Sequence, residues 1–120
     1  MLVRINTDKN IDGSARMRIY FSGVIESTLE RFTDHITRVE VHLSDENSQK
    51  EGPDDKRCLI EARVKGLQPI AVTHKAESLV EAVIGAAEKM KNTLRTTIAK
   101  MRAYQKDRPH YQVIHKSLLP

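Results

Sequence analysis

The sequence predicts an α+β fold, a two-layer sandwich in which a four-stranded sheet carries two helices on one face. Apolar residues recur every three or four positions over residues 15–32 and 78–105, as in helices, whereas four other segments alternate as strands do. The predicted order is β-α-β-β-β-α, which makes the first two strands parallel through a right-handed crossover and the later pairs antiparallel hairpins. Because each helix and each long strand has one apolar side, we expect the second face of the sheet to lie in solvent.

The N-terminal elements are a strand over residues 2–6, a turn-rich segment, and a helix from Ala15 to about Phe32. Ser14 is a residue type that caps helix N-termini, because its hydroxyl can accept a hydrogen bond from an unpaired amide. Gly23 lies inside this helix, where glycine costs up to about 1 kcal/mol relative to alanine. We expect close packing against a neighbouring element to be the reason for it.

Three further strands are predicted over residues 36–44, 56–65 and 68–75. In the first of them Val39, Val41 and Leu43 alternate with polar residues, which indicates a half-buried strand. Residues 45–55 contain five acids, a glycine and a proline, and predict a mobile hairpin loop. Pro69 has no amide to donate, so the last strand should begin at an edge or a bulge.

The longest predicted element runs from Ser78 to Gln105. It opens with Ser78-Leu79-Val80-Glu81, a capping box in which the Ser and Glu side chains can each satisfy an amide of the other. One face of the helix is apolar and consists of Leu79, Val83, Ala86, Ala87, Met90, Leu94, Ile98 and Met101. Acids stop at Glu88, and six basic residues follow without an acid between them, namely Lys89, Lys91, Arg95, Lys100, Arg102 and Lys106.

These basic residues allow two interpretations. A solvated helix face explains part of the bias, because cations stabilise the C-terminal end of a helix dipole. Six cations with no compensating acid exceed that need and favour contacts with RNA phosphates. At about 100° per residue, Lys89 and Lys100 lie on one flank of the helix, and the other flank carries Lys91, Arg95, Arg102 and Lys106. Residues that could extend the basic surface are Arg31, Arg38, Lys56 and Arg57.

Length and composition predict one domain, and we expect neither a membrane span nor a signal peptide. We predict a domain over residues 1–106 and a flexible C-terminal tail over 107–120, where no periodicity is visible. The net charge of +4 and the pI near 9.3 favour an acidic partner. Aromatic residues make up only 4%, too few for a platform that stacks single-stranded bases, so phosphates and shape should dominate any contact with nucleic acid.

No residue pattern points to catalysis or to a metal. Cys58 has no partner for a disulfide, which is typical of a reducing cytosol, and it alternates with the apolar face of its strand as a core residue does. His42 and His74 lie on different strands without the spacing of a zinc site, and we expect both to be exposed. We therefore predict no enzyme activity, no metal and no cofactor.

Three stretches carry a resemblance to a known family. The run LERFTDHITRVEV, residues 29–41, is similar to a helix-to-strand junction, and AVTHKAESLVEAV, residues 71–83, is similar to a last strand and second helix. Lys89-Met90-x-x-x-Leu94 matches a run inside that helix. Together these stretches resemble the family of ribosome hibernation-promoting factors and ribosome-associated translation inhibitors, also called the sigma-54 modulation protein family. The similarity covers residues 1–105.

The resemblance implies a short-form member with the double-stranded-RNA-binding-like fold, located in the cytoplasm. Members of this family bind the small ribosomal subunit in the channel of mRNA and tRNA, and hold ribosomes inactive in stationary phase or stress. The site residues that this interpretation assigns to rRNA are Lys89, Lys91, Arg95, Lys100, Arg102, Lys106, Arg31 and Arg38. We expect a monomer that does not bind DNA or membranes. The alternative function is a non-catalytic protein-interaction module that uses the mixed charges of the exposed sheet face.

Overall fold

A computed structural model describes residues 1–46 and 55–118, and the side chains of residues 1–46 and 55–104. Its elements are β1 (Leu2–Thr7), α1 (Ala15–Thr28), the short 3-10 helix η1 (Glu30–Phe32), β2 (Ile36–Asp45), β3 (Lys56–Val64), β4 (Ile70–Ala76) and α2 (Leu79–Leu118). The predicted α+β class and element order are confirmed. The predicted mobility of the acidic loop falls on residues 47–54, which lie outside the described residues.

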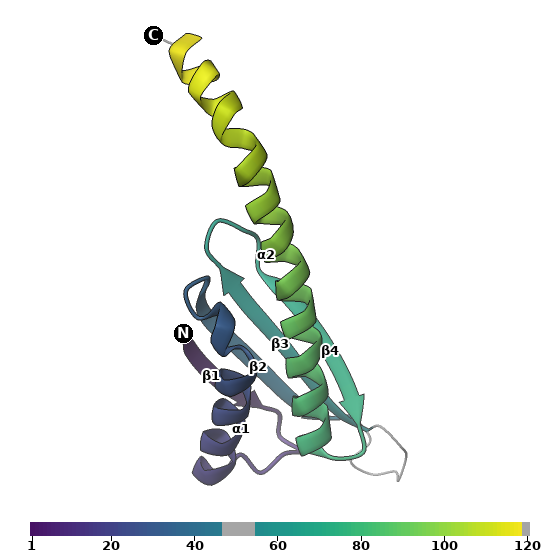
Figure 1. Ribbon diagram of the computed structural model, residues 1–120. Coiled ribbons are helices and arrows are strands. Elements are labelled where there is room, and N and C mark those ends of the chain that lie inside the picture. The colour runs from purple at the N-terminus through teal and green to yellow at the C-terminus, as the bar shows by residue number, and fades with distance from the viewer. Residues whose placement is uncertain (47–54, 119–120) are drawn as a thin grey trace.

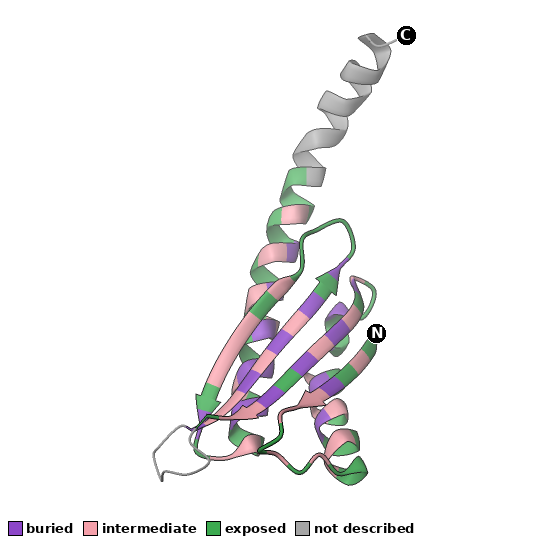
Figure 2. Cartoon of the chain, turned by 180° about the vertical axis from the view of Figure 1, so that it is seen from behind, coloured by how far each residue is buried: buried purple, intermediate pink, exposed green. Residues whose placement is uncertain are grey.

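The four strands form one sheet in the order β1-β2-β3-β4. β1 pairs in parallel with β2, and the two other pairs are antiparallel, as the crossover and the two hairpins predict. Both helices cover the same face of this sheet (Figure 1). The opposite face, seen from behind, carries no helix (Figure 2). The chain is therefore a two-layer sandwich with an open sheet face.

The hydrophobic core lies between the sheet and the helices. Alternate residues of β2 and β3 point into it, and the apolar stripes of α1 and α2 complete it. Its fully buried side chains include Ile25, Leu29, Val41, Ile60, Met90 and Leu94. Burying one side chain of this size stabilises the fold by roughly 1.5–3 kcal/mol. Cys58 is buried among them, as predicted.

Both helices begin at the predicted serines. The Ser14 hydroxyl accepts a hydrogen bond from the amide of Met17 at 3.1 Å, and the Ser78 hydroxyl accepts one from the amide of Glu81 at 3.1 Å. Each serine satisfies one of the amides that a helix N-terminus leaves unpaired. The start of each helix, and with it the placement of its side chains along the sheet, is thereby fixed by the local sequence.

The ends of both helices differ from the prediction. α1 stops at Thr28, and the chain tightens into η1, where the amide of Phe32 donates to the carbonyl of Leu29 at 2.9 Å. This tighter turn lets both Leu29 and Phe32 enter the core. α2 continues to Leu118, whereas an irregular segment was expected from residue 107 onward. The predicted domain over residues 1–106 and the flexibility of 107–120 both stay predictions.

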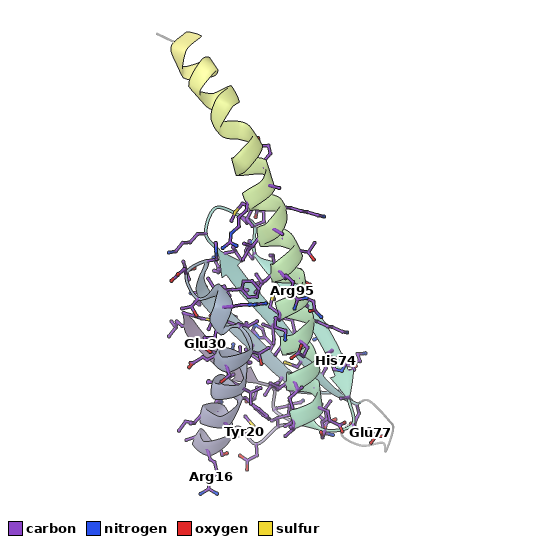
Figure 3. All side chains as sticks on the ribbon, viewed as in Figure 1. Arg16, Tyr20, Glu30, His74, Glu77 and Arg95 are labelled. Carbon is purple, nitrogen blue, oxygen red and sulfur yellow. The ribbon has the colours of Figure 1, made fainter. Side chains whose placement is uncertain are left out.

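Two glycines within helices have opposite surroundings. A Cβ atom at Gly23 would meet nothing within 4 Å, so the expectation of close packing there is wrong. A Cβ atom at Gly85 would lie 2.1 Å from the ring of His74, which packs between β4 and α2 (Figure 3). His74 is accordingly half-buried and not exposed as expected, because Gly85 leaves room for its ring. His42 is exposed, as predicted.

Candidate nucleic-acid interface

The basic residues of α2 owe their placement to its apolar stripe. Met90, Leu94 and Ile98 are buried against the sheet, which fixes the rotation of the helix about its axis. Arg95 and Arg102 are seven residues apart, or about 10.5 Å along the axis, so they lie on the same flank of the helix. This flank faces the side of α1 and η1, and both arginines are exposed.

Three arginines from two elements meet at this flank. Arg31 of η1, Arg95 and Arg102 line one surface hollow of about 270 Å³. The remaining wall residues are Phe32, Ile98 and Ala99. We call this site the arginine hollow and define it by these six residues. The tight turn of η1 produces it, because the turn buries Phe32 and leaves the adjacent Arg31 on the surface beside α2.

Protein contacts hold two of the three guanidinium groups. The guanidinium carbon of Arg31 lies 5.9 Å from the centre of the Phe32 ring, within the range of a cation–π interaction. Nη2 of Arg102 lies 3.3 Å from Nε2 of His35, which accepts this hydrogen bond in its neutral form. Within the described part of the chain, no carboxylate forms an ion pair with Arg31, Arg95 or Arg102. Their charges are therefore open to an external anion.

The other predicted basic residues of α2 are placed differently. Lys91 shares the flank with Arg95, but its ammonium group pairs with the Glu88 carboxylate at 3.0 Å. Lys89 lies on the opposite flank and donates to the carbonyl oxygen of Thr73 in β4 at 2.9 Å. Lys100 is exposed on that opposite flank as well. The side chain of Lys106 lies outside the described residues.

Arg38 lies on the open face of the sheet, away from the arginine hollow. Its Nε atom is 3.3 Å from a carboxylate oxygen of Glu40, and the same carboxylate accepts a hydrogen bond from Asn6 at 3.0 Å. The structure thus brings Arg31, Arg95 and Arg102 together and leaves Arg38 on the other side of the molecule. Its predicted contact with RNA stays a prediction.

Lys56 and Arg57 form ion pairs with acids of the chain at the base of the β2–β3 hairpin. The ammonium group of Lys56 lies 3.1 Å from Asp55 and 3.2 Å from Asp45, and these hydrogen bonds raise the pKa of Lys56. Arg57 pairs with Glu46 at 3.5 Å. The acids at both ends of the loop therefore neutralise the cations that follow it.

A larger hollow of about 630 Å³ lies between α1 and β1. Arg18 of α1 lines this hollow. Its guanidinium group donates one hydrogen bond to the backbone oxygen of Ile5 and another, of 3.2 Å, to the backbone oxygen of Gly13. This guanidinium serves to tie the first strand to the first helix. Within the part of the chain that the structure describes, the arginines of the smaller hollow donate no such hydrogen bond to the backbone, which separates a structural arginine from candidate binding residues.

The described residues include no group of three or more His, Cys, Asp or Glu side chains that could hold a metal ion. Burial raises the pKa of the Cys58 thiol to about 12, so the thiol is protonated at neutral pH. In the same part of the chain, no helix combines the length and the apolar character that a membrane crossing needs.

Comparison with known proteins identifies the family. Residues 5–102 match the family described as sigma 54 modulation protein / S30EA ribosomal protein. The chain belongs to this S30EA family. The match includes at least part of every element of the sandwich and both segments that form the arginine hollow. The predicted family is therefore confirmed.

Solved structures share the fold of this S30EA protein. The N-terminal domain of Protein Y from Thermus thermophilus superposes with a TM-score of 0.65 at 16% identity, covering 81% of this chain and 99% of that domain. A ribosomal subunit interface protein from Coxiella burnetii gives a TM-score of 0.62 at 16% identity, covering 82% of this chain and 99% of its own. The comparison with curated proteins gives no match. At these identities the structural likeness establishes the fold.

The sequence patterns did not identify the two residues that contact the guanidinium groups of Arg102 and Arg31. His35, which contacts Arg102 from 67 positions away, lies in the turn before β2 and has no pattern that points to an interface. Phe32 was assigned to a helix, so its ring was not expected beneath Arg31. The LERF run before β2 was a usable signal, since an arginine beside a buried aromatic residue is a common arrangement for a surface cation.

Proposed function

We propose that this S30EA-family protein binds the small ribosomal subunit through rRNA of the decoding channel, and inhibits translation or stabilises idle ribosomes under stress or in stationary phase. The role is non-catalytic and cytoplasmic. Occupancy of the channel by a rigid sandwich would exclude mRNA and tRNA. Family membership supports association with the ribosome, and a protein of the same fold from Coxiella burnetii is a ribosomal subunit interface protein.

The observation that carries the proposal is the exposed basic flank of α2. Between Lys89 and Tyr104 the helix has five basic residues and no acid, and its two arginines have no carboxylate partner among the described residues. Phosphate contacts of this kind supply most of the affinity of nonspecific RNA binding and make it fall with salt. For single-stranded RNA each neutralised phosphate contributes roughly 0.7 to the slope of log affinity against log salt, and for a duplex roughly 0.9.

Co-sedimentation with purified small subunits over a salt series tests the proposal. Wild-type protein should pellet at low salt and dissociate as salt rises. A variant with Lys91, Arg95, Arg102 and Lys106 changed to Ala should lose binding. If the wild-type protein does not pellet with small subunits at low salt, the proposal is contradicted.

The open sheet face supports a second candidate function, a protein-interaction module. Its charges are of both signs, and Arg38 is already paired with Glu40 within the chain. A surface of this kind suits a protein partner better than RNA. Binding to one purified protein that resists both salt and ribonuclease would favour this candidate over the first.

A further inference from the structure

We propose that the arginine hollow is a phosphate-binding site that clamps a phosphodiester of RNA between η1 and α2. This inference rests on the proposed function, because it takes RNA as the source of the phosphate. It goes beyond that function by separating three arginines from the other cations of the surface. The chain has to fold for the site to exist, since Arg31 is 64 positions before Arg95 in the sequence.

The cations of the surface differ in whether a carboxylate of the chain pairs with them. Lys56, Arg57, Lys75, Lys91 and Arg38 each form an ion pair with a carboxylate of the chain. The three arginines of the hollow form none with any described residue, although they lie close enough to repel one another. Placing three guanidinium groups around one hollow of about 270 Å³ costs electrostatic energy unless an anion joins them.

The acids nearest to η1 lie away from the arginine hollow. Glu26 and Glu30 face a separate hollow, which they line together with Met1, Ser27 and Thr33. The turn of η1 thereby sends Glu30 and Arg31 to different sides, and among the described residues no carboxylate lines the arginine hollow. Figure 3 shows Glu30 on the outer side of the helical layer and Arg95 on α2. The hollow is selective in charge as well as rich in cations.

The guanidinium groups of the hollow also have a shape and a placement that suit a phosphate group. A guanidinium group presents two parallel N–H donors that match two phosphate oxygens, which a lysine ammonium group cannot do. Arg31 is placed by the Phe32 ring and Arg102 by His35, so two of the three groups lose little freedom when they bind. The wall formed by Ile98, Ala99 and Phe32 is apolar, and offers no hydrogen bonds that would compete with the phosphate.

The test compares two triple variants that each lose three positive charges. The hollow variant carries Arg31→Gln, Arg95→Gln and Arg102→Gln. The control variant carries Lys9→Gln, Arg16→Gln and Arg63→Gln, three exposed cations outside the hollow with no ion pair among the described residues. Circular dichroism melting curves establish that both variants fold.

Affinity for a short RNA hairpin is then measured by fluorescence anisotropy over a salt series. The hollow variant should bind at least about 100-fold more weakly, because each lost charge-assisted hydrogen bond lowers affinity by roughly tenfold. Its salt slope should fall by about 0.7–0.9, the contribution of the one phosphate that the hollow neutralises, whereas the control should keep the wild-type slope and lose no more than about threefold in affinity. Equal losses in both folded variants would overturn the proposal.

The Nε–H signals of the arginine side chains in NMR spectra of the wild-type protein identify the source of the phosphate. Titrated RNA should shift the signals of Arg31, Arg95 and Arg102 to saturation and leave Arg16 and Arg63 in place. Inorganic phosphate should produce the same shifts only at concentrations at least about tenfold higher. Equal potency of inorganic phosphate would overturn the assignment to RNA, and uniform shifts of all arginines would overturn the site.

This design separates the hollow from the proposed function. If RNA saturates the hollow while the wild-type protein does not pellet with small subunits, the phosphate site stands and the ribosomal function falls. If the protein pellets and the hollow variant pellets equally well, the ribosomal function stands and the phosphate site is contradicted.

Discussion

Arg95 and Lys91 are one helical turn apart on the same flank of α2, yet only the lysine has a carboxylate partner. Glu88 neutralises Lys91 at 3.0 Å, one turn towards the N-terminus. The sequence shows both residues as equal cations of one acid-free stretch, because Glu88 precedes that stretch by a single residue. The described cations of the basic flank therefore differ in their pairing. The lysine is paired with a carboxylate, and the arginines are open to an external anion.

The contrast between these two residues predicts a difference in binding. Arg95→Ala should weaken affinity for small subunits by about tenfold, because it removes an unpaired, bidentate donor. Lys91→Ala should cost at most about threefold, since much of its charge is already balanced by Glu88. Dissociation constants from co-sedimentation at one fixed salt concentration measure both effects. A larger loss for Lys91→Ala would contradict the assignment.

The two helical glycines predict stability changes of opposite sign. Gly23→Ala should stabilise the protein by about 0.5–1 kcal/mol, because alanine favours the helix and open space surrounds the new methyl group. Gly85→Ala should destabilise it by about 1–3 kcal/mol, because the methyl group would overlap the His74 ring. Urea denaturation measures both free energies of unfolding. His74→Ala should remove most of the cost of Gly85→Ala, and independent, additive effects of the two changes would contradict the contact.

Cys58 predicts how stability depends on pH. Burial raises the pKa of its thiol from 9.0 to about 12 in the folded chain. The protonated thiol therefore makes its full contribution to the free energy of unfolding below about pH 9. This contribution is lost as the pH rises towards 12. The difference in unfolding free energy between the wild type and Cys58→Ala should shrink from pH 8 to pH 11. A difference that stays constant over this range would show that the thiol is not held protonated by the fold.

At the scale of elements, the local sequence predicts where helices begin better than where they end. Ser14 and Ser78 mark the starts of α1 and α2, because a hydroxyl cap acts within three residues. The end of α1 depends on the burial of Leu29 and Phe32 against other elements, which no local pattern reveals. The same 3-10 turn places Arg31 at the hollow, so the missed helix end and the incompletely predicted site have one cause.

The strands were predictable because alternation and burial agree along them. Val39, Val41 and Leu43 are buried in β2, and Cys58, Ile60 and Ala62 are buried in β3, as the period of two requires. The position of His74 was not predictable, because it depends on an absent side chain at residue 85 of another element. The periodicity of a sequence does not predict such side-chain contacts between elements that are distant in the chain.

For the molecule as a whole, the two layers divide the charge between them. The helical layer presents the arginine hollow, whose described lining residues include no carboxylate, whereas on the sheet face Glu40 pairs with Arg38 and accepts a hydrogen bond from Asn6. The sequence predicted a basic flank on the second helix and named Arg31 among the residues that could extend it, and the structure places Arg31 of η1 beside Arg95 and Arg102. The central claim of this account is that the protein turns its helical layer towards rRNA.

Hydroxyl-radical cleavage of rRNA by a tethered iron chelate tests this claim most directly. Ala99→Cys places the chelate at the arginine hollow, and Ala71→Cys places it on the exposed sheet side of β4, opposite Glu61 in the pairing register. The buried Cys58 thiol should not take up the chelate at neutral pH. With equal amounts of protein bound to small subunits, the Ala99→Cys variant should cut rRNA strongly and the Ala71→Cys variant weakly. Stronger cleavage from the Ala71→Cys variant would show that the sheet face meets the RNA, and would contradict the account.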